Sequence, residues 1–146
     1  MSQTYIGSAL RTGSGTLTDS VDGGFTNSMQ TGTVTTDASG LPSSVSFTIP
    51  AYAQILNFLV DMVTVPSFGT ATTVPATIGT TAGGSQYLTI ADASLTGRTT
   101  PVFTAAQLTA MSNIGTNQTV VFTIDPNGTI ATPGVFRLTV VYAQKV

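Results

Sequence analysis

The sequence predicts an all-β protein, an antiparallel β-sandwich of the jelly-roll type with about eight strands. Thr makes up 29 of the 146 residues and charged residues only 7%, against about 25% charged residues in an average soluble domain. The stiff, β-branched Thr side chain suits the half-buried surface of a pleated sheet. The 15 Gly and 7 Pro residues punctuate the chain, and its strand-like runs lack the strand–helix alternation that builds a parallel sheet.

The chain divides into an N-terminal segment, residues 1–30, and one sandwich domain, residues 31–146. The N-terminal segment is rich in Gly, Ser and Thr but also holds apolar residues such as Leu17 and Phe25. A pure linker lacks such anchors, so we expect an extended arm or an irregular edge segment.

The first strands are expected directly after this segment. TGTVTTD at 31–37 fits a short strand and ASGLP at 38–42 a turn. SVSFTI at 44–49 alternates apolar and polar residues, which predicts a half-buried strand that ends at Pro50 because proline has no donor for the ladder.

Residues 55–65, ILNFLVDMVTV, fit either a helix or a strand. As a strand, one side is almost wholly apolar, since it takes every second residue from Leu56 through Phe58 and Val60. The β-branched residues and the prolines on both flanks favour a strand buried on most of both faces. Residues 51–54 then form the corner that leads into it.

The middle of the chain predicts two strands and a helix. ATTVPATIGT at 71–80 is expected to be a strand whose internal proline suggests an edge or a bulge, and TAGG at 81–84 and SQYLTIAD at 85–92 a turn and a strand. Within 100–115, Thr104 and Gln107 have capping-box spacing. A helix of about two turns is therefore expected, with Gly115 as a possible end.

The C-terminal third predicts a hairpin and a long strand. In 119–131, DPNG separates two strand-like runs and provides the chemistry of a turn. In VFRLTVVYAQKV at 135–146, a long strand is expected, in which Phe136, Leu138, Val140 and Tyr142 alternate with Val135, Arg137, Thr139 and Val141. Across all the expected strands of the chain, ten residues are expected to form the core and support assembly: Val45, Phe47, Ile49, Phe58, Val60, Phe122, Phe136, Leu138, Val140 and Tyr142.

The composition argues against an enzyme. The chain has no His, Cys or Glu, and its one Lys is Lys145, so a nucleophile next to a base is not expected. Asp61 lies in an apolar run, where burial would raise its pKa, but a polar break at a strand edge or bend explains it more simply. DSVDGG at 19–24 is rich in oxygen ligands yet lacks the EF-hand spacing. We expect no catalytic, cofactor or metal site.

The scattered cations argue against nucleic acid as a partner, and the lack of a long apolar run argues against a membrane. The four cations, Arg11, Arg98, Arg137 and Lys145, are scattered, whereas nucleic-acid binding needs clustered Lys and Arg. The chain has no run of about 18 apolar residues, so no membrane-spanning helix is expected. A surface with so few charges desolvates cheaply, and interface cores are depleted in charge, so we expect a face that is buried against another protein.

Three stretches resemble small virion proteins of tailed bacteriophages: SVSFTIPAYAQILNFLVDMVTV, TIGTTAGGSQYLTIADASLTGR and TVVFTIDPNGTIATPGVFRLTVVYAQKV. The shared features are a strand that ends in Pro–Ala before a corner, an Ile–Gly pair, a Gly-rich turn, Tyr–Leu before Gly–Arg, and a final Val-x-Tyr strand. The resemblance covers about residues 44–146.

This resemblance implies a jelly-roll or similar sandwich on a virion. It implies a non-enzymatic cement or decoration protein, commonly a homotrimer, that binds the major capsid protein on the capsid surface and stabilises the shell. The alternative that remains open is a fibre or receptor-binding module on the tail or head.

Overall fold

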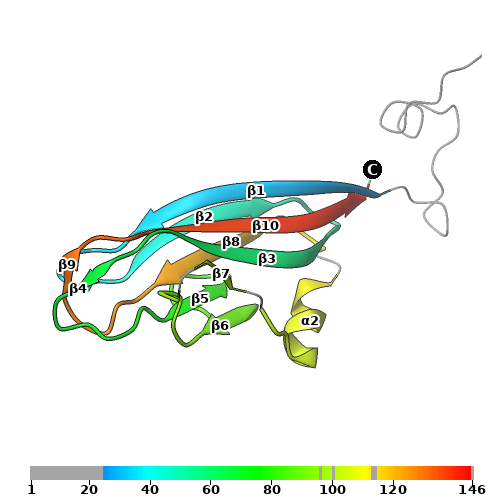
Figure 1. Cartoon of the computed structure of the whole chain (residues 1–146). Coiled ribbons are helices and arrows are strands. Elements are labelled where there is room, and N and C mark those ends of the chain that lie inside the picture. The colour runs from blue at the N-terminus through cyan, green and yellow to red at the C-terminus, as the bar shows by residue number, and fades with distance from the viewer. Residues whose placement is uncertain (1–24, 96, 100, 113–114, 146) are drawn as a thin grey trace, which may run out of the picture.

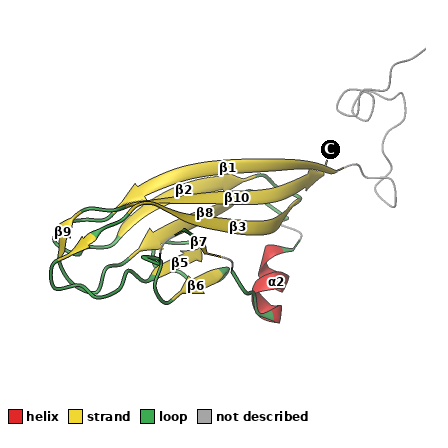
Figure 2. Ribbon diagram, viewed as in Figure 1, coloured by secondary structure: helices red, strands yellow, loops and turns green. Residues whose placement is uncertain are grey.

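The computed structural model describes residues 25–145 apart from 96, 100 and 113–114. The expected arm, as far as residue 24, and the DSVDGG stretch lie outside the described residues. Two four-stranded antiparallel sheets pack as a sandwich (Figures 1 and 2). The all-β prediction is thus confirmed.

The first sheet, here the β1 sheet, has the order β1 (Phe25–Thr35), β10 (Val135–Lys145), β3 (Ala53–Thr64) and β7 (Arg98–Thr99). The second, the β2 sheet, has the order β2 (Ser43–Ile49), β8 (Gln118–Ile124), β5 (Ala76–Gly79) and β6 (Leu88–Ile90). A short ribbon of β4 (Ser67–Phe68) and β9 (Ile130–Thr132) lies at one end of the sandwich, and α2 (Ala105–Met111) at the other (Figure 1).

The strand pairing is that of a jelly roll. Among the eight sandwich strands the first pairs with the last, β1 with β10, and the pairs β2–β8, β3–β7 and β5–β6 nest inside it. Such nesting is that of one long hairpin rolled into two sheets, and it wraps the apolar faces around a common core. β10–β3 and β8–β5 complete the two sheets, all antiparallel.

The alternation predicted for β2 and β10 is present. Phe136, Leu138 and Val140 of β10 are fully buried, and the residues between them face outward and are only half-buried. In β2, Phe47 and Ile49 are buried while Thr48 is exposed. The strand period of two therefore directs one side of each strand into the core.

β3 is a strand, as the flanking prolines suggested, but its alternation is interrupted. Tyr142 lies opposite Ile55 and Val141 opposite Asn57, so Leu56 has no partner in β10. This is a β-bulge, which moves the following residues to the other face. Leu56 is consequently 42% exposed while Phe58 is buried, and the expectation that both lie on one side was wrong.

α2 confirms the predicted helix and its cap. The Thr104 hydroxyl accepts a hydrogen bond from Gln107 N at 3.3 Å, and the Gln107 side chain accepts one from Thr104 N at 2.8 Å. The helix ends at Met111, with Ser112 as C-cap, four residues before the expected glycine. Met111 is buried in the core cluster, so α2 closes one end of the sandwich (Figure 2).

The bounds of several strands differ from those expected. β3 starts at Ala53, inside the corner expected at 51–54, and β6 covers only three residues of the strand expected at 85–92. β1 starts at Phe25, so residues 25–30, which were expected to belong to the N-terminal segment, are part of a regular edge strand. The strand expected at 71–80 is only β5, and it is an inner strand between β8 and β6. Pro75 is tolerated because it stands immediately before β5, where no ladder donor is needed.

The hairpin expected at 119–131 does not form. β9 pairs with β4, not with β8: Phe68 lies opposite Ile130. The reason is the DPNG segment, whose Asn127 carboxamide oxygen accepts hydrogen bonds from the backbone N–H groups of Thr72 and Thr73 at 2.9 and 3.1 Å. These contacts direct the chain toward residues 70–73 and away from β8.

Candidate functional site

The ten residues expected to form the core lie inside the sandwich. Nine are buried, and the tenth, Val45, is half-buried and packs against the same cluster. They hold the two sheets together, so any part they have in assembly is indirect. Contacts with another molecule must come from outward-facing residues.

The outer face of the β1 sheet is the broadest candidate. Residues directly opposite each other in antiparallel strands share a face, and the register gives three outward rows across the sheet. The rows are Thr33–Arg137–Asp61–Arg98, Thr31–Thr139–Leu59 and Met29–Val141–Asn57. We call these ten residues the outer β1 face.

Asp61 is the electrostatic centre of the outer β1 face. Arg98 Nε donates to Asp61 Oδ1 at 2.6 Å and Arg98 Nη2 to Oδ2 at 3.0 Å. Arg137 Nη2 and Nε donate to Oδ2 at 2.8 and 3.2 Å. Asp61, whose side chain is only 11% exposed, thus links three strands, β3, β7 and β10.

The arginines decide the charge state of this carboxylate. Hydrogen bonds from Arg98 lower the pKa of Asp61, burial opposes them, and hydrogen bonds from Arg137 with the charges of both guanidiniums add to the lowering, to about 2. The expectation that burial would raise this pKa was wrong, because it considered desolvation without the cations. Asp61 also lies between β10 and β7 within the sheet, not at an edge or bend.

Pairing of a short strand with β3 brings Arg98 to this position. β7 is only two residues long and places Arg98 opposite Asp61. Just before it, Gly97 has φ +98° and its carbonyl accepts from Met62 N at 3.2 Å. Glycine adopts this left-handed conformation without strain, so the turn can return to β3 at the correct register.

Sequence reasoning did not find this network. Asp61 is 37 residues from Arg98 and 76 from Arg137, and no local pattern links them. One signal was available: an Asp in an apolar strand requires a compensating cation, and the chain has only four Lys and Arg residues.

The outer face of the β2 sheet differs in chemistry. Its rows carry Ser and Thr, for example Ser44–Thr123–Thr77–Thr89 and Thr48–Thr119. Part of it is covered by the loop that follows β5: Gly83 N donates to Thr123 Oγ1 at 2.9 Å. A Cβ on Gly79 would lie 2.4 Å from the backbone of Gly84, so the loop packs directly on this glycine.

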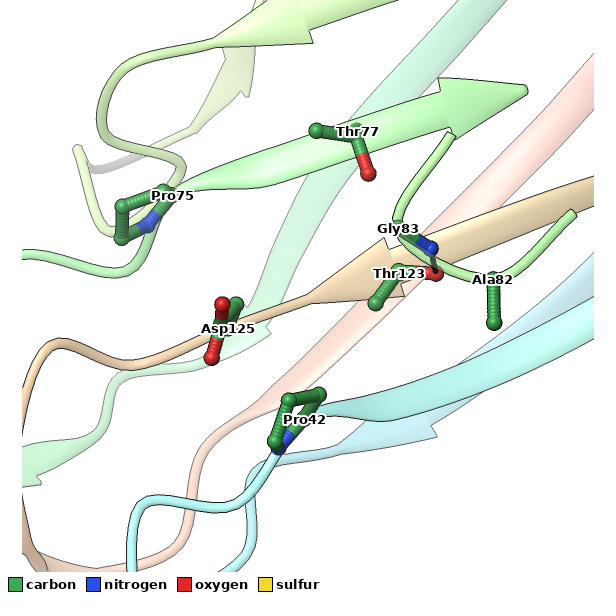
Figure 3. Close-up of a pocket in the computed structure, with 7 residues that line it drawn as sticks. All are labelled: Pro42, Pro75, Thr77, Ala82, Gly83, Thr123 and Asp125. Atoms are coloured by element: carbon green, nitrogen blue, oxygen red, sulfur yellow. Dashed lines mark hydrogen bonds between the residues drawn. The ribbon is translucent and has the colours of Figure 1, made fainter. Parts of the chain in front are cut away.

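A hollow of ≈ 350 Å³ lies beside this loop (Figure 3). Asp125 is the one titratable group among its lining residues, which makes a pair of acid–base groups impossible there. Two prolines form part of the remaining wall. The lining residues are Pro42, Pro75, Thr77, Ala82, Gly83, Thr123 and Asp125.

Exposed apolar side chains occur at both ends of the sandwich. Val63, Val65 and Phe68 are exposed near the β4–β9 ribbon, and Val102 and Leu108 are exposed around α2. The two regions lie at opposite ends of the molecule (Figure 1). They add apolar surface to the contacts that the outer β1 face offers.

The described part of the chain offers neither a metal cluster nor a membrane-spanning helix. Among the described residues, no group of three or more His, Cys, Asp or Glu side chains could hold a metal ion. No described helix is long and apolar enough to cross a membrane. The chain matches no protein-family model, no curated protein and no solved structure.

Proposed function

We propose that this chain is a non-enzymatic structural protein of a phage virion, a capsid cement or decoration protein. It binds the outside of the shell and stabilises it by bridging subunits of the major capsid protein. The observation that carries the proposal is the outer β1 face, an exposed sheet surface whose one carboxylate is held by two arginines of the same face. The resemblance of residues 44–146 to virion proteins supplies the biological setting.

Several polar groups of the outer β1 face already have partners on the same face, which lowers the free-energy cost of burying them. Its carboxylate is paired with two arginines, and the Thr31 and Thr139 hydroxyls bond each other at 2.9 Å. Burial of unpaired polar groups is costly, whereas these groups keep their partners inside an interface. Met29, 70% exposed, adds an apolar side chain of the kind enriched at interface cores.

The fold suits a mechanical role. β1, β3 and β10 are 11, 12 and 11 residues long and lie side by side in one sheet. A sheet of this length with a close-packed core deforms little. A rigid plate that contacts neighbouring shell subunits with the outer β1 face resists their separation.

Homotrimerisation fits this role. A trimer on a local three-fold axis of the shell would give each neighbouring coat subunit an equivalent contact, as closed symmetry requires. The exposed apolar residues at the two ends of the sandwich provide surface for contacts between copies.

A receptor-binding module on the tail or head is the second candidate, and the hollow on the β2 sheet favours it. Asp125 and the Thr77 hydroxyl line this hollow, and carboxylates and hydroxyls bind the hydroxyls of sugars by hydrogen bonds. Such a protein acts at few positions per particle, whereas a cement protein covers the shell.

Copy number separates the two functions. Quantitative mass spectrometry of purified particles, with the major coat protein as internal reference, measures it directly. A copy number close to that of the coat protein supports the cement function. Sedimentation of added protein together with particles that lack it supports the same function. A few dozen copies or fewer, with no binding to bare shells, refute the cement function and favour the receptor-binding module.

A further inference from the structure

We propose that Arg98 and Arg137 form an anchor that binds a carboxylate side chain, Asp or Glu, of the partner protein. The inference deepens the proposed function, on which it rests, by naming the chemistry that the shell presents to the outer β1 face. It follows from the charge, donors and surroundings of the two guanidinium groups.

The charges around Asp61 do not balance. Two guanidinium groups share one carboxylate, which leaves one positive charge in excess on the face. No other described acidic residue compensates it: Asp37 lies in the β1–β2 connection, Asp92 in the loop before β7, and Asp125 lines the hollow on the β2 sheet. An anion from outside is therefore attracted to this position.

Both arginines have donors to offer. Each guanidinium carries five N–H groups, and here the Nε and Nη2 groups are the ones that bond Asp61. In the part of the chain that the structure describes, Nη1 of each arginine donates to no residue. The Arg98 and Arg137 side chains are 56% and 43% exposed, so a second carboxylate can reach them.

The shared carboxylate also holds the arginines in place. Arg98 donates one hydrogen bond to each carboxylate oxygen of Asp61, and these two bonds fix the plane of the Arg98 guanidinium. A partner carboxylate then binds a preorganised site and does not have to order a flexible side chain, which reduces the entropic cost of binding.

The neighbours favour a protein as the source of the anion. Leu59, Val141 and Met29 lie in the next rows of the same face, and such apolar groups match the mixed contacts of a protein interface. Nucleic acid would need several cations along a backbone track, whereas this face has two.

A glutamate placed on this face tests the inference. Thr33 lies directly opposite Arg137 in β1 and is exposed. Thr33→Glu puts a carboxylate beside the excess charge and competes with the partner from within. We expect roughly tenfold weaker binding to shells that lack the protein, equivalent to the loss of about one charged contact.

Two matched variants control for size and total charge. Thr33→Gln has the same shape without the charge, and Ser46→Glu adds the same charge at an exposed position of β2 on the opposite sheet. Ser46→Glu should bind shells as the wild type does, Thr33→Glu should bind them roughly tenfold more weakly than Thr33→Gln, and all three variants should melt within a few degrees of the wild type. Equal binding by Thr33→Glu and Ser46→Glu overturns the inference while the cement function stands.

A titration without shells distinguishes a failure of the proposed anchor from a failure of the cement function. Tetraglutamate is added to the ¹⁵N-labelled protein, and the Nε–H signals of Arg98 and Arg137 are followed by NMR. We expect both signals to shift in the wild type and in Thr33→Gln, and much less in Thr33→Glu. If wild-type protein fails to bind shells, the cement function is refuted and this titration alone decides: unshifted signals overturn the anchor.

Discussion

Phe58→Ala tests the bulge in β3 and the core that depends on it. Phe58 is fully buried, with its ring centroid 5.8 Å from that of Tyr87 and 6.3 Å from that of Phe103. Phe-to-Ala changes in a core cost about 3–5 kcal/mol, since the lost transfer energy is joined by the energy of the cavity. Phe103 is only half-buried and can relax into the space, so we expect about 3 kcal/mol.

The matched control is Leu56→Ala, two positions away in the same strand. Strict alternation would place both side chains in the core, but the bulge leaves Leu56 42% exposed. Its truncation should therefore cost less than about 1 kcal/mol. The ratio of the two values measures the effect of the bulge.

Urea denaturation followed by circular dichroism gives both free energies of unfolding, with thermal melts as a second measurement. At roughly 3 °C per kcal/mol for a chain of this size, Phe58→Ala should melt about 10 °C below the wild type and Leu56→Ala within about 3 °C of it. Equal losses for the two variants would refute the bulge. An unchanged midpoint for Phe58→Ala would refute its place in the core.

Two further predictions concern pH and backbone packing. Because the folded-state pKa of Asp61 is lowered from 3.8 to about 2, its contribution is fully present above about pH 4 and is lost as the pH falls toward 2. This contribution is roughly 1–2 kcal/mol, reduced by the exposure of both arginines. Asp61→Asn should thus be less stable at pH 7, and its deficit against the wild type should shrink between pH 4 and 2 in urea titrations; a constant deficit would contradict the ion network. Gly79→Ala should cost more than about 2 kcal/mol, because its Cβ would lie 2.4 Å from the backbone of Gly84. Gly115→Ala, where a Cβ meets nothing within 4 Å, should be neutral, and equal melting of the two alanine variants would refute the close contact of the loop.

Local signals in the sequence predicted several elements. The alternation in 44–49 and 135–146 predicted β2 and β10 with the correct residues inside, since a strand's period of two needs no knowledge of its neighbours. The capping box of Thr104 and Gln107 predicted the start of α2, because its hydrogen bonds span only three residues. Composition predicted the all-β class, as Thr and β-branched residues suit pleated sheets.

The candidate site depended on contacts that no local pattern contains. Asp61 was noticed as unusual, but its partners come from β7 and β10, 37 and 76 residues away. The outer β1 face likewise needs the register of four strands before its rows can be written. The ten residues singled out from the sequence were apolar, and they form the core, not the contact surface.

The sequence by itself determined the fold class, the inward sides of β2 and β10, the helix and the absence of His, Cys and Glu from any site. Only the tertiary structure decided that Leu56 bulges out of β3, that β9 pairs with β4, and that two arginines meet over Asp61. The physical reason is the separation along the chain over which each effect acts. Propensity, period and capping act over a few residues, whereas register, bulges and ion pairs are fixed by segments that meet only when the sheets assemble.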